Sequence, residues 1–474
     1  MNNFTEVVLR KTKVKVHPYI PNSAPEVKQA MLKEIGIKKV DELYNEIPSK
    51  IRFKGKLNIP DGIESEFALK RHVETILAKN TSCVDNLSFL GGGVANHYVP
   101  VICDEVNSRA EFLTAYAGEP YEDHGRFQSL WEFQSLMAEL LDVEVVSVPT
   151  FDGAQAASSS IGMIRRYTGR DEILISDTTS PDRLAVIQNY CHPMIKITMV
   201  KHNVKTGMMD IEDLKQKMTK NVAGIYFENP SYLGFIETEG KEISKIVHKN
   251  GGKVIVYADP ISLGVLTPPS NYGADITCGE IQPLGLHINY GGATGGYIGV
   301  NDDPKLVQEY PWRLFGIDKT EVEGEWGFGD VLYDDRTSFG NRETGKDYVG
   351  TASALWGITA GVYLALMGPE GMKEVGTVIM QRSQYAAKKI SGIKGIKAPA
   401  IDSPFFKEFI VDFNKTGKTV SQINKALEKK GIFGGKDLSK EFKELGQSAL
   451  FCITEENTKE DIDRLVSELK NIIK

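Results

Sequence analysis

The sequence predicts an α/β fold in which a mostly parallel sheet is covered by helices on both faces. Helical segments and short strand-like runs alternate from about residue 128 to 300, and such alternation joins parallel strands through helical crossovers. The run Lys253–Tyr257 is β-branched and apolar, as in a buried strand. With 474 residues, of which 41% are hydrophobic, the chain can bury a large core and divide into two or three domains.

Residues 1–80 form the first predicted domain, a charged helical arm that acts as a docking element or a lid. Ser23-Ala24-Pro25-Glu26 predicts a capping box at the start of a helix. The apolar residues that follow it have helical spacing: Val27, Met31, Leu32 and Ile35.

Residues 81–330 form the second predicted domain, the large α/β domain. It begins with loops rich in glycine, histidine and aromatic residues, ending in the polar and aromatic run 114–125. Loops of this composition carry function more often than cores do. Gln128–Leu141 predicts a helix. The predicted strands are Val145–Pro149, Glu172–Ser176, Ile195–Val200, Val222–Glu228, Lys253–Asp259, Asp275–Cys278 and Gly296–Val300.

The third predicted domain, residues 331–474, combines a connection with a smaller α/β domain. Residues 301–350 are rich in glycine and break the alternation, which predicts a long connection near the ligand edge of the sheet or at an interface. Ala352–Met367 predicts a small apolar helix, and Pro369 is placed to begin the next one. The remaining predicted elements are the strand Ala449–Ile453 and the amphipathic helix Glu460–Ile473.

Charge and cysteine content exclude several classes of protein. The net charge is -7 and both signs are interspersed, so no basic stripe indicates nucleic acid and no polybasic run indicates a membrane surface. The 5 cysteines are scattered and contain no CxxC pair, which argues against a disulfide framework and a zinc site. The first 21 residues contain no apolar signal region. We therefore expect a cytoplasmic protein that neither crosses nor binds a membrane.

Two motifs together match the pyridoxal phosphate site of the aspartate aminotransferase-like fold, also called fold type I. Asp259 follows a buried strand, at the sheet edge where ligands bind in open α/β folds. Asp152-Gly153-Ala154 opens a helix whose free N–H groups favour a phosphate. In such enzymes the aspartate pairs with the pyridine nitrogen and a later lysine forms the Schiff base.

The lysine is missing from this chain. No lysine occurs between Lys253 and Lys305, and the fragment that should hold it reads CGEIQPLG, residues 278–285. Pyridoxal phosphate is therefore not expected to be bound covalently here, and the pocket is predicted to be a relic. Asp152, Gly153, Ala154 and Asp259 are its candidate cofactor-binding residues, and the alternative is that both aspartates serve only as turn or helix-capping residues.

Short motifs in a fixed order carry a family resemblance over nearly the whole chain. In sequence order they are YIPN (19–22), LGGG (90–93), HYVP (97–100), SRAEFLTAY (108–116), DGA (152–154), ENP (228–230), ADP (258–260), QPLG (282–285) and GPEG (368–371), with a weaker echo in ITE (453–455). In this order they resemble subunit 1, the alpha subunit, of the two-chain glycine dehydrogenase (decarboxylating), the P-protein of the glycine cleavage system.

The resemblance accounts for the missing lysine. It implies a heterotetramer in which subunit 2, the beta subunit, carries the Schiff-base lysine and the pyridoxal phosphate. It implies decarboxylation of glycine and transfer of the aminomethyl group to the lipoyl arm of H-protein.

Four residues are candidates for a shared catalytic site. Tyr116 and Tyr121 lie in a predicted loop, and a phenol can stack on a ring while donating a hydrogen bond. His97 and Tyr98 belong to a family motif, but they are also consistent with a buried, hydrogen-bonded pair under the glycine turn.

Three stretches depart from the family pattern, at Asn96, at residues 120–125 and at residues 344–351. They leave open a divergent paralogue acting on another amino acid or carrier. Two further hypotheses compete with the family function. One is a non-catalytic scaffold subunit, and the other is a stand-alone pyridoxal enzyme that forms its Schiff base with Lys346.

Overall fold

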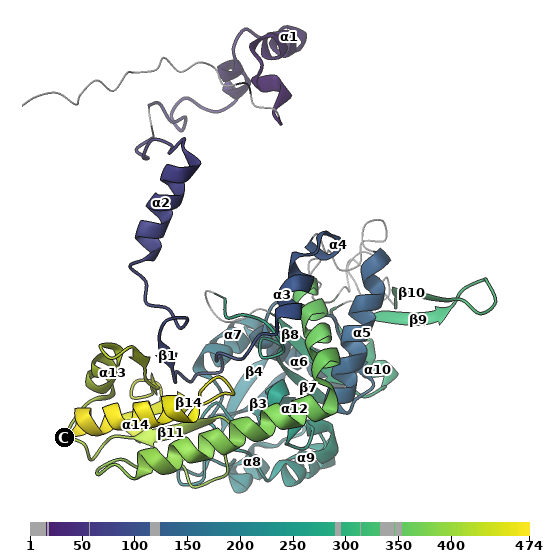
Figure 1. Ribbon diagram of the computed structural model, residues 1–474. Coiled ribbons are helices and arrows are strands. Elements are labelled where there is room, and N and C mark those ends of the chain that lie inside the picture. Colours follow the sequence, from purple (N-terminus) through teal and green to yellow (C-terminus); the bar gives the residue numbers. More distant parts are fainter. Residues whose placement is uncertain are drawn as a thin grey trace, which may run out of the picture. The chain divides into compact units, whose positions relative to one another are not determined.

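The protein is described by a computed structural model that covers residues 16, 19–55, 57–113, 124–289, 295–312, 314–331, 346 and 353–474. The chain divides into two compact units, Met1–Asn80 and Thr81–Lys474. The element labels are those of Figure 1.

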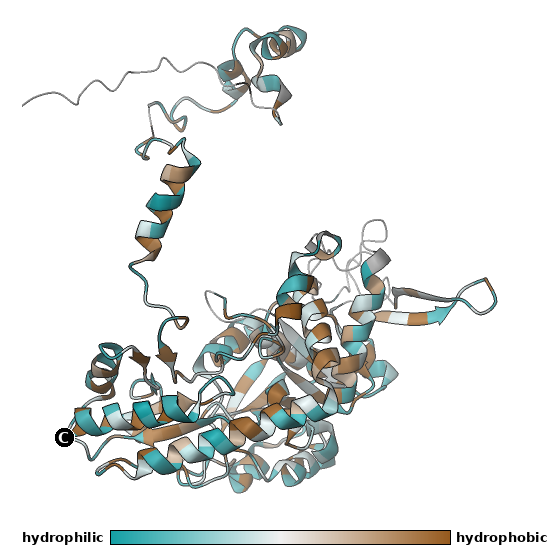
Figure 2. Cartoon of the chain, viewed as in Figure 1, coloured by the Kyte–Doolittle hydropathy of each residue, from teal (hydrophilic) through white to brown (hydrophobic). Residues whose placement is uncertain are grey.

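The first unit contains short helices with little buried surface. They are η1 (Pro21–Ser23), α1 (Pro25–Ile35), η2 (Val40–Tyr44) and α2 (Glu66–Leu77). The predicted capping box of α1 is wrong, because Ala24 is the N-cap and makes no side-chain bond while Pro25 takes the first helical position. Ser65 does cap α2, accepting the Ala68 N–H at 3.3 Å. Hydrophilic and hydrophobic bands alternate along α2 in Figure 2.

A seven-stranded sheet forms the centre of the second unit, with the strand order β2-β8-β7-β6-β5-β3-β4. Strands β3 to β7 pair in parallel, whereas β8 runs antiparallel to both of its neighbours. The predicted mostly parallel sheet is therefore confirmed. The strands are β2 (Val145–Val146), β3 (Glu172–Ser176), β4 (Lys196–Val200), β5 (Val222–Glu228), β6 (Lys253–Tyr257), β7 (Ile276–Glu280) and β8 (Gly296–Val300).

Helices bury both faces of this sheet. On β6, Ile255 packs in the cluster that contains Ile161 and Ile164 of one helix, whereas Val254 and Val256 pack in another cluster. This alternation follows from the period of two of a β-strand. The helices between the strands are α6 (Gly153–Thr168), α7 (Pro181–Cys191), α8 (Ile211–Lys217), α9 (Gly240–Lys249), η3 (Pro260–Gly264) and η4 (Pro269–Tyr272).

A second, three-stranded antiparallel sheet has the order β11-β14-β13. Its strands are β11 (Glu408–Asp412), β13 (Lys436–Asp437) and β14 (Ser448–Cys452), and the helices packed near it are α13 (Val420–Glu428) and α14 (Lys459–Ile473). The long helix α12 (Ala354–Ser391) is interrupted at Gly368, which has φ 56° and ψ -175° just before Pro369. The predicted helix boundary therefore appears as a break within α12 (Figure 1).

The remaining elements lie outside these two sheets. A hairpin of β9 (Phe315–Lys319) and β10 (Trp326–Asp330) lies in the stretch for which the sequence predicts an irregular connection. β1 (Leu87–Ser88) pairs in parallel with β12 (Ile432–Phe433). The other helices are α3 (Val101–Ser108), α4 (Ala110–Leu113), α5 (His124–Leu141), α10 (Pro304–Val307) and η5 (Lys443–Leu445). Within the described ranges, no helix has the length and apolar character needed to cross a membrane.

Candidate functional site

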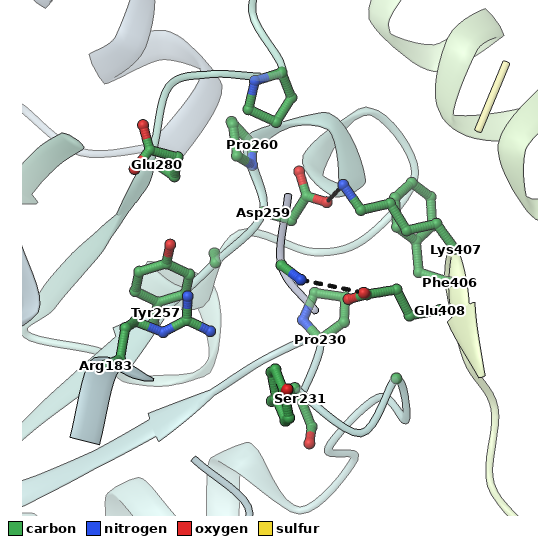
Figure 3. A pocket seen from close by; sticks show the side chains of 15 residues that line it. Arg183, Pro230, Ser231, Tyr257, Asp259, Pro260, Glu280, Phe406, Lys407 and Glu408 are labelled. Carbon is green, nitrogen blue, oxygen red and sulfur yellow. Dashed lines mark hydrogen bonds and ion pairs between the residues drawn. The ribbon is translucent and has the colours of Figure 1, made fainter. Parts of the chain in front are cut away.

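A small pocket with several charged side chains in its wall lies at the carboxyl end of β6, where the large sheet meets the start of β11 (Figure 3). Its volume is about 40 Å³, which is room for one or two water molecules. Asp259, Glu280 and Lys407 are among the residues that line it. The position agrees with the rule that ligand sites of open α/β sheets lie at the carboxyl edge.

Asp259 has two functions in the structure. Its carboxylate accepts the Ile261 N–H at 3.1 Å and so caps η3. Its Oδ2 atom also lies 2.6 Å from the ammonium nitrogen of Lys407, and Figure 3 shows the two side chains pointing at each other. The capping interpretation is therefore correct for Asp259, but it does not describe all that this carboxylate does.

Lys407 reaches the pocket from the residue just before β11 and is only 6% exposed. Burial, the largest single effect, would lower the pKa of its ammonium group, but Asp259, Cys452 and Glu408 together outweigh burial and raise the pKa above its ordinary value. Lys407 also contacts Nε2 of His97 at 3.1 Å. The amine is therefore held in its charged form.

His97 lies between Lys407 and Glu455. Its Nδ1 atom is 2.9 Å from Oε2 of Glu455. Because the ammonium of Lys407 can only donate, Nε2 of His97 accepts, and we assign the ring proton to Nδ1, which donates to Glu455. Burial would raise the pKa of Glu455, but the His97 ring and the Tyr98 N–H at 2.8 Å outweigh it and lower the pKa to about 2.

The start of α6 is engaged by a carboxylate of the chain itself. Asp152 is the N-cap and accepts the Gln155 N–H at 2.7 Å. The N–H of Gly153 donates to Oε2 of Glu280 at 2.8 Å, and the N–H of Gly295 donates to Oε1 at 3.0 Å. The carboxylate of Glu280 therefore occupies the position at the start of this helix that favours an anion.

Arg183 and Tyr257 close the pocket next to this helix start. The guanidinium of Arg183 stacks over the Tyr257 ring at 4.0 Å and makes a two-point ion pair with Glu228 at 2.7 and 3.0 Å. A Cβ atom at Gly153 would lie 2.5 Å from the Tyr257 hydroxyl oxygen. Little space therefore remains between the tyrosine and the helix.

The pocket does not fit pyridoxal phosphate. A cofactor site needs roughly 300 Å³ or more, far above the volume of about 40 Å³ found here. Glu280 takes the N–H of Gly153 to which a phosphate would bind, and its negative charge would repel that phosphate. Lys407 lies at Asp259, where the pyridine nitrogen would lie, and its protonated amine is not a Schiff-base nucleophile.

The structure brings some of the predicted residues together and separates others. Asp259 and His97 both contact Lys407, and Gly153, preceded by its N-cap Asp152 and followed by Ala154, contacts the pocket residue Glu280. The catalytic roles of His97 and Tyr98 stay predictions. Tyr116 and Tyr121 lie outside the described residues.

The predicted pairing of His97 with Tyr98 in one buried site is wrong for the tyrosine. His97 is 5% exposed, whereas Tyr98 is 59% exposed. The Tyr98 side chain instead belongs to the wall of a separate shallow cavity of about 260 Å³ that Tyr363 and Glu455 also line. The two side chains therefore have different surroundings, although the residues are consecutive.

Lys346 does not approach Asp259. Its ammonium hydrogen-bonds the Gln308 carbonyl and lies 3.4 Å from Oε2 of Glu309, next to α10. The geometry therefore does not support a Schiff base from Lys346 in this pocket.

Sequence reasoning missed Lys407, Glu280 and Glu455 as members of the site. Lys407 and Glu408 interrupt the apolar run Phe405–Val411, and a charged pair inside a strand-like run is a signal of a buried ionic site. Glu280 occupies the fragment from which the lysine is missing. An acidic residue in that fragment could have been interpreted as a replacement for an anion.

The sequence model described as glycine cleavage system P-protein matches residues 17–469 of this chain. The chain belongs to that family. A probable glycine dehydrogenase (decarboxylating) subunit 1 of Staphylothermus marinus is 39% identical over 465 residues, covering 96% of this chain and 98% of the relative. Its counterpart from Pyrococcus abyssi is 38% identical over 459 residues, covering 96% and 99%. The resemblance drawn from the motif order is confirmed.

Solved structures agree with this assignment. A crystal structure of glycine decarboxylase (P-protein) of the glycine cleavage system, in inhibitor-bound form, has a TM-score of 0.85 and 29% identity, covering 97% of this chain and 100% of that one. Sphingosine-1-phosphate lyase of Burkholderia pseudomallei has a TM-score of 0.65 at 12% identity, covering 90% and 94%, which speaks for the fold alone. The predicted aspartate aminotransferase-like fold is confirmed.

Proposed function

We propose that this chain is the alpha subunit of a two-chain glycine decarboxylase and works only with a lysine-bearing beta subunit. The observation that carries the proposal is a full-length likeness to subunit 1 proteins in a chain whose own pocket holds an ion pair. A pyridoxal enzyme needs a free amine for its Schiff base. We infer that the partner supplies it, in a heterotetramer.

The proposed reaction is decarboxylation of glycine followed by transfer of the aminomethyl group to the lipoyl arm of H-protein. Pyridoxal phosphate, bound by the partner, supplies an electron sink for the charge left when CO2 departs. The task left to this chain is to orient groups around the partner's site and to exclude water from it.

Tyr98 is the described residue best suited to that task. It follows the anchored His97, and its own N–H is held by Glu455, so its exposed ring is presented from a fixed backbone. A phenol ring offers both a flat apolar face and a hydrogen-bond donor. Tyr116 and Tyr121 are proposed to line the same shared site. His97 would act as a positioning residue, since Lys407 and Glu455 engage both of its ring nitrogens.

The test is an absorbance spectrum of the full chain alone and of the chain co-purified with its lysine-bearing partner, each before and after borohydride. We expect a reducible chromophore in the pair only, together with glycine-dependent CO2 exchange. Colour in the single chain would contradict the proposal. Activity of the pair with another amino acid but not with glycine would identify a divergent paralogue instead.

A further inference from the structure

Two buried side chains of opposite charge hold the positions in the pocket that a pyridoxal phosphate would need. Lys407 is 6% exposed and Glu280 is 8% exposed. One brings a cation to Asp259, and the other brings an anion to the start of α6. These are the two charged groups of the cofactor, a protonated pyridine nitrogen and a phosphate.

Glu280 meets the hydrogen-bonding needs of an anion site. Its two oxygens accept N–H groups from Gly153 and Gly295, which come from different segments of the chain. Removing the carboxylate would leave two buried donors without an acceptor, which is costly. A phosphate has oxygens of the same kind and favours the same helix start.

Lys407 does something that a dissociable cofactor does not do. It precedes β11 of the three-stranded sheet, while Asp259 follows β6 of the seven-stranded sheet. Its neighbour Glu408 accepts the Gly92 N–H at 2.7 Å and the Gly93 N–H at 3.2 Å. The ion pair therefore joins the two sheets through side chains of the chain itself, at the edge where a ligand would otherwise lie between them.

We infer that Glu280 and Lys407 are internal replacements for the cofactor's anionic and cationic groups. They keep the pocket folded without a ligand, and Glu280 excludes phosphate from the start of α6. Taking the carboxylate away therefore restores an anion site. This inference concerns the chain alone and is independent of the proposed reaction.

The test is thermal unfolding of the full chain and of its Glu280→Ala variant in sodium phosphate and in sodium chloride of equal ionic strength. Phosphate stabilises folded proteins in general. The informative quantity is therefore the rise in Tm that phosphate causes in the variant minus the rise that it causes in the wild type. With phosphate at about 100 times its dissociation constant, we expect an excess rise in Tm of about 2–4 °C in the variant. Equal shifts in variant and wild type would overturn the inference.

Glu237→Ala is the matched control. Glu237 is also buried and also accepts two backbone N–H groups, from Met209 and Glu239, each at 2.8 Å. The control should lose stability without gaining any excess response to phosphate. A response equal to that of Glu280→Ala would mean that phosphate fills any vacated carboxylate site, and the inference would fail.

Glu280→Gln keeps the test decisive if the alanine variant does not fold. The amide keeps one acceptor but loses the charge that the start of α6 favours. We expect its Tm to fall about 1–2 °C further below wild type than that of Glu237→Gln. The same fall in both variants would show that the charge of Glu280 has no special role at α6.

Discussion

The ammonium nitrogen of Lys407 lies 2.6 Å from Oδ2 of Asp259, so a lysine of one sheet neutralises the aspartate at the tip of a strand in the other. Both side chains are largely buried, with 7% and 17% of their side-chain surfaces exposed. Breaking such a pair by removing one charge is far more costly than removing both. Asp259 therefore has a structural role in this chain.

Removing Lys407 alone should strongly destabilise the protein. We expect Lys407→Met to lower the free energy of unfolding by about 3–5 kcal/mol, because it leaves the Asp259 carboxylate buried without its counter-charge. The double variant Lys407→Met with Asp259→Leu should recover a large part of the loss. The measurement is urea unfolding of the wild type, both single variants and the double variant.

The exposed pair Lys459 and Asp463, 2.9 Å apart on α14, provides the comparison for this cycle. Lys459→Met should leave the urea midpoint unchanged, because exposed ion pairs contribute little. If the losses from Lys407→Met and Asp259→Leu simply added in the double variant, the two residues would not be coupled.

Glu455 should make the protein more stable above pH 4.5 than at low pH. Its pKa of about 2 in the folded chain lies below its ordinary value of 4.5, so its contribution is complete above pH 4.5 and is lost as the pH falls towards 2. Glu455→Gln should therefore differ most from wild type at neutral pH and progressively less towards pH 3, as measured by urea unfolding.

Glu408→Gln should give the opposite trend and serves as the control within the same cluster. Burial raises the pKa of Glu408, and the opposing effects of Lys407 and the Gly92 and Gly93 N–H groups only partly offset it. The contribution of this carboxyl group to the free energy of unfolding is complete below the pKa that it has in the unfolded chain, and it is lost as the pH rises. The free energy of unfolding of the variant should therefore rise relative to that of the wild type from about pH 4 to pH 7. Parallel curves for the two variants would contradict the assigned signs.

Local patterns were sufficient to predict the sheet but not the pocket. Val222–Glu228 is a strand with the predicted bounds, and all seven residues are buried, as expected for a mostly apolar run in a sheet that helices cover on both faces. The tip position of Asp259 follows from the same reasoning. The contact between Lys407 and His97 joins residues 310 positions apart. Contacts between residues so far apart depend on how separate elements pack against each other, and a local sequence pattern holds no information about that packing.

The glycine at position 234 should be essential for placing β11 against the large sheet. Gly234 has φ 92°, and a Cβ atom there would lie 2.1 Å from the backbone oxygen of Glu408. Gly234→Ala should therefore cost about 3 kcal/mol or more, from the left-handed backbone and the clash together. Unfolding in urea measures the loss.

Gly324→Ala separates the two contributions. Gly324 has φ 87° in the hairpin of β9 and β10, and a Cβ atom there would meet nothing within 4 Å. This variant should lose only about 1–2 kcal/mol, the cost of the backbone conformation. Similar losses at Gly324 and Gly234 would mean that the close approach to Glu408 has no structural importance.

Tyr98 provides the sharpest distinction between an active-site subunit and a passive scaffold. Its side chain is 59% exposed and its backbone is fixed by Glu455, so Tyr98→Ala should leave Tm and assembly with the beta subunit unchanged. If the ring orients groups in the partner's site, turnover of the complex should fall by about tenfold or more. Tyr98→Phe tells whether the loss comes from the ring or from the hydroxyl.

Met194, 58% exposed, is a matched surface position, and Met194→Ala should retain full turnover. Full turnover in Tyr98→Ala, with assembly intact, would remove this residue from the site and favour the scaffold hypothesis.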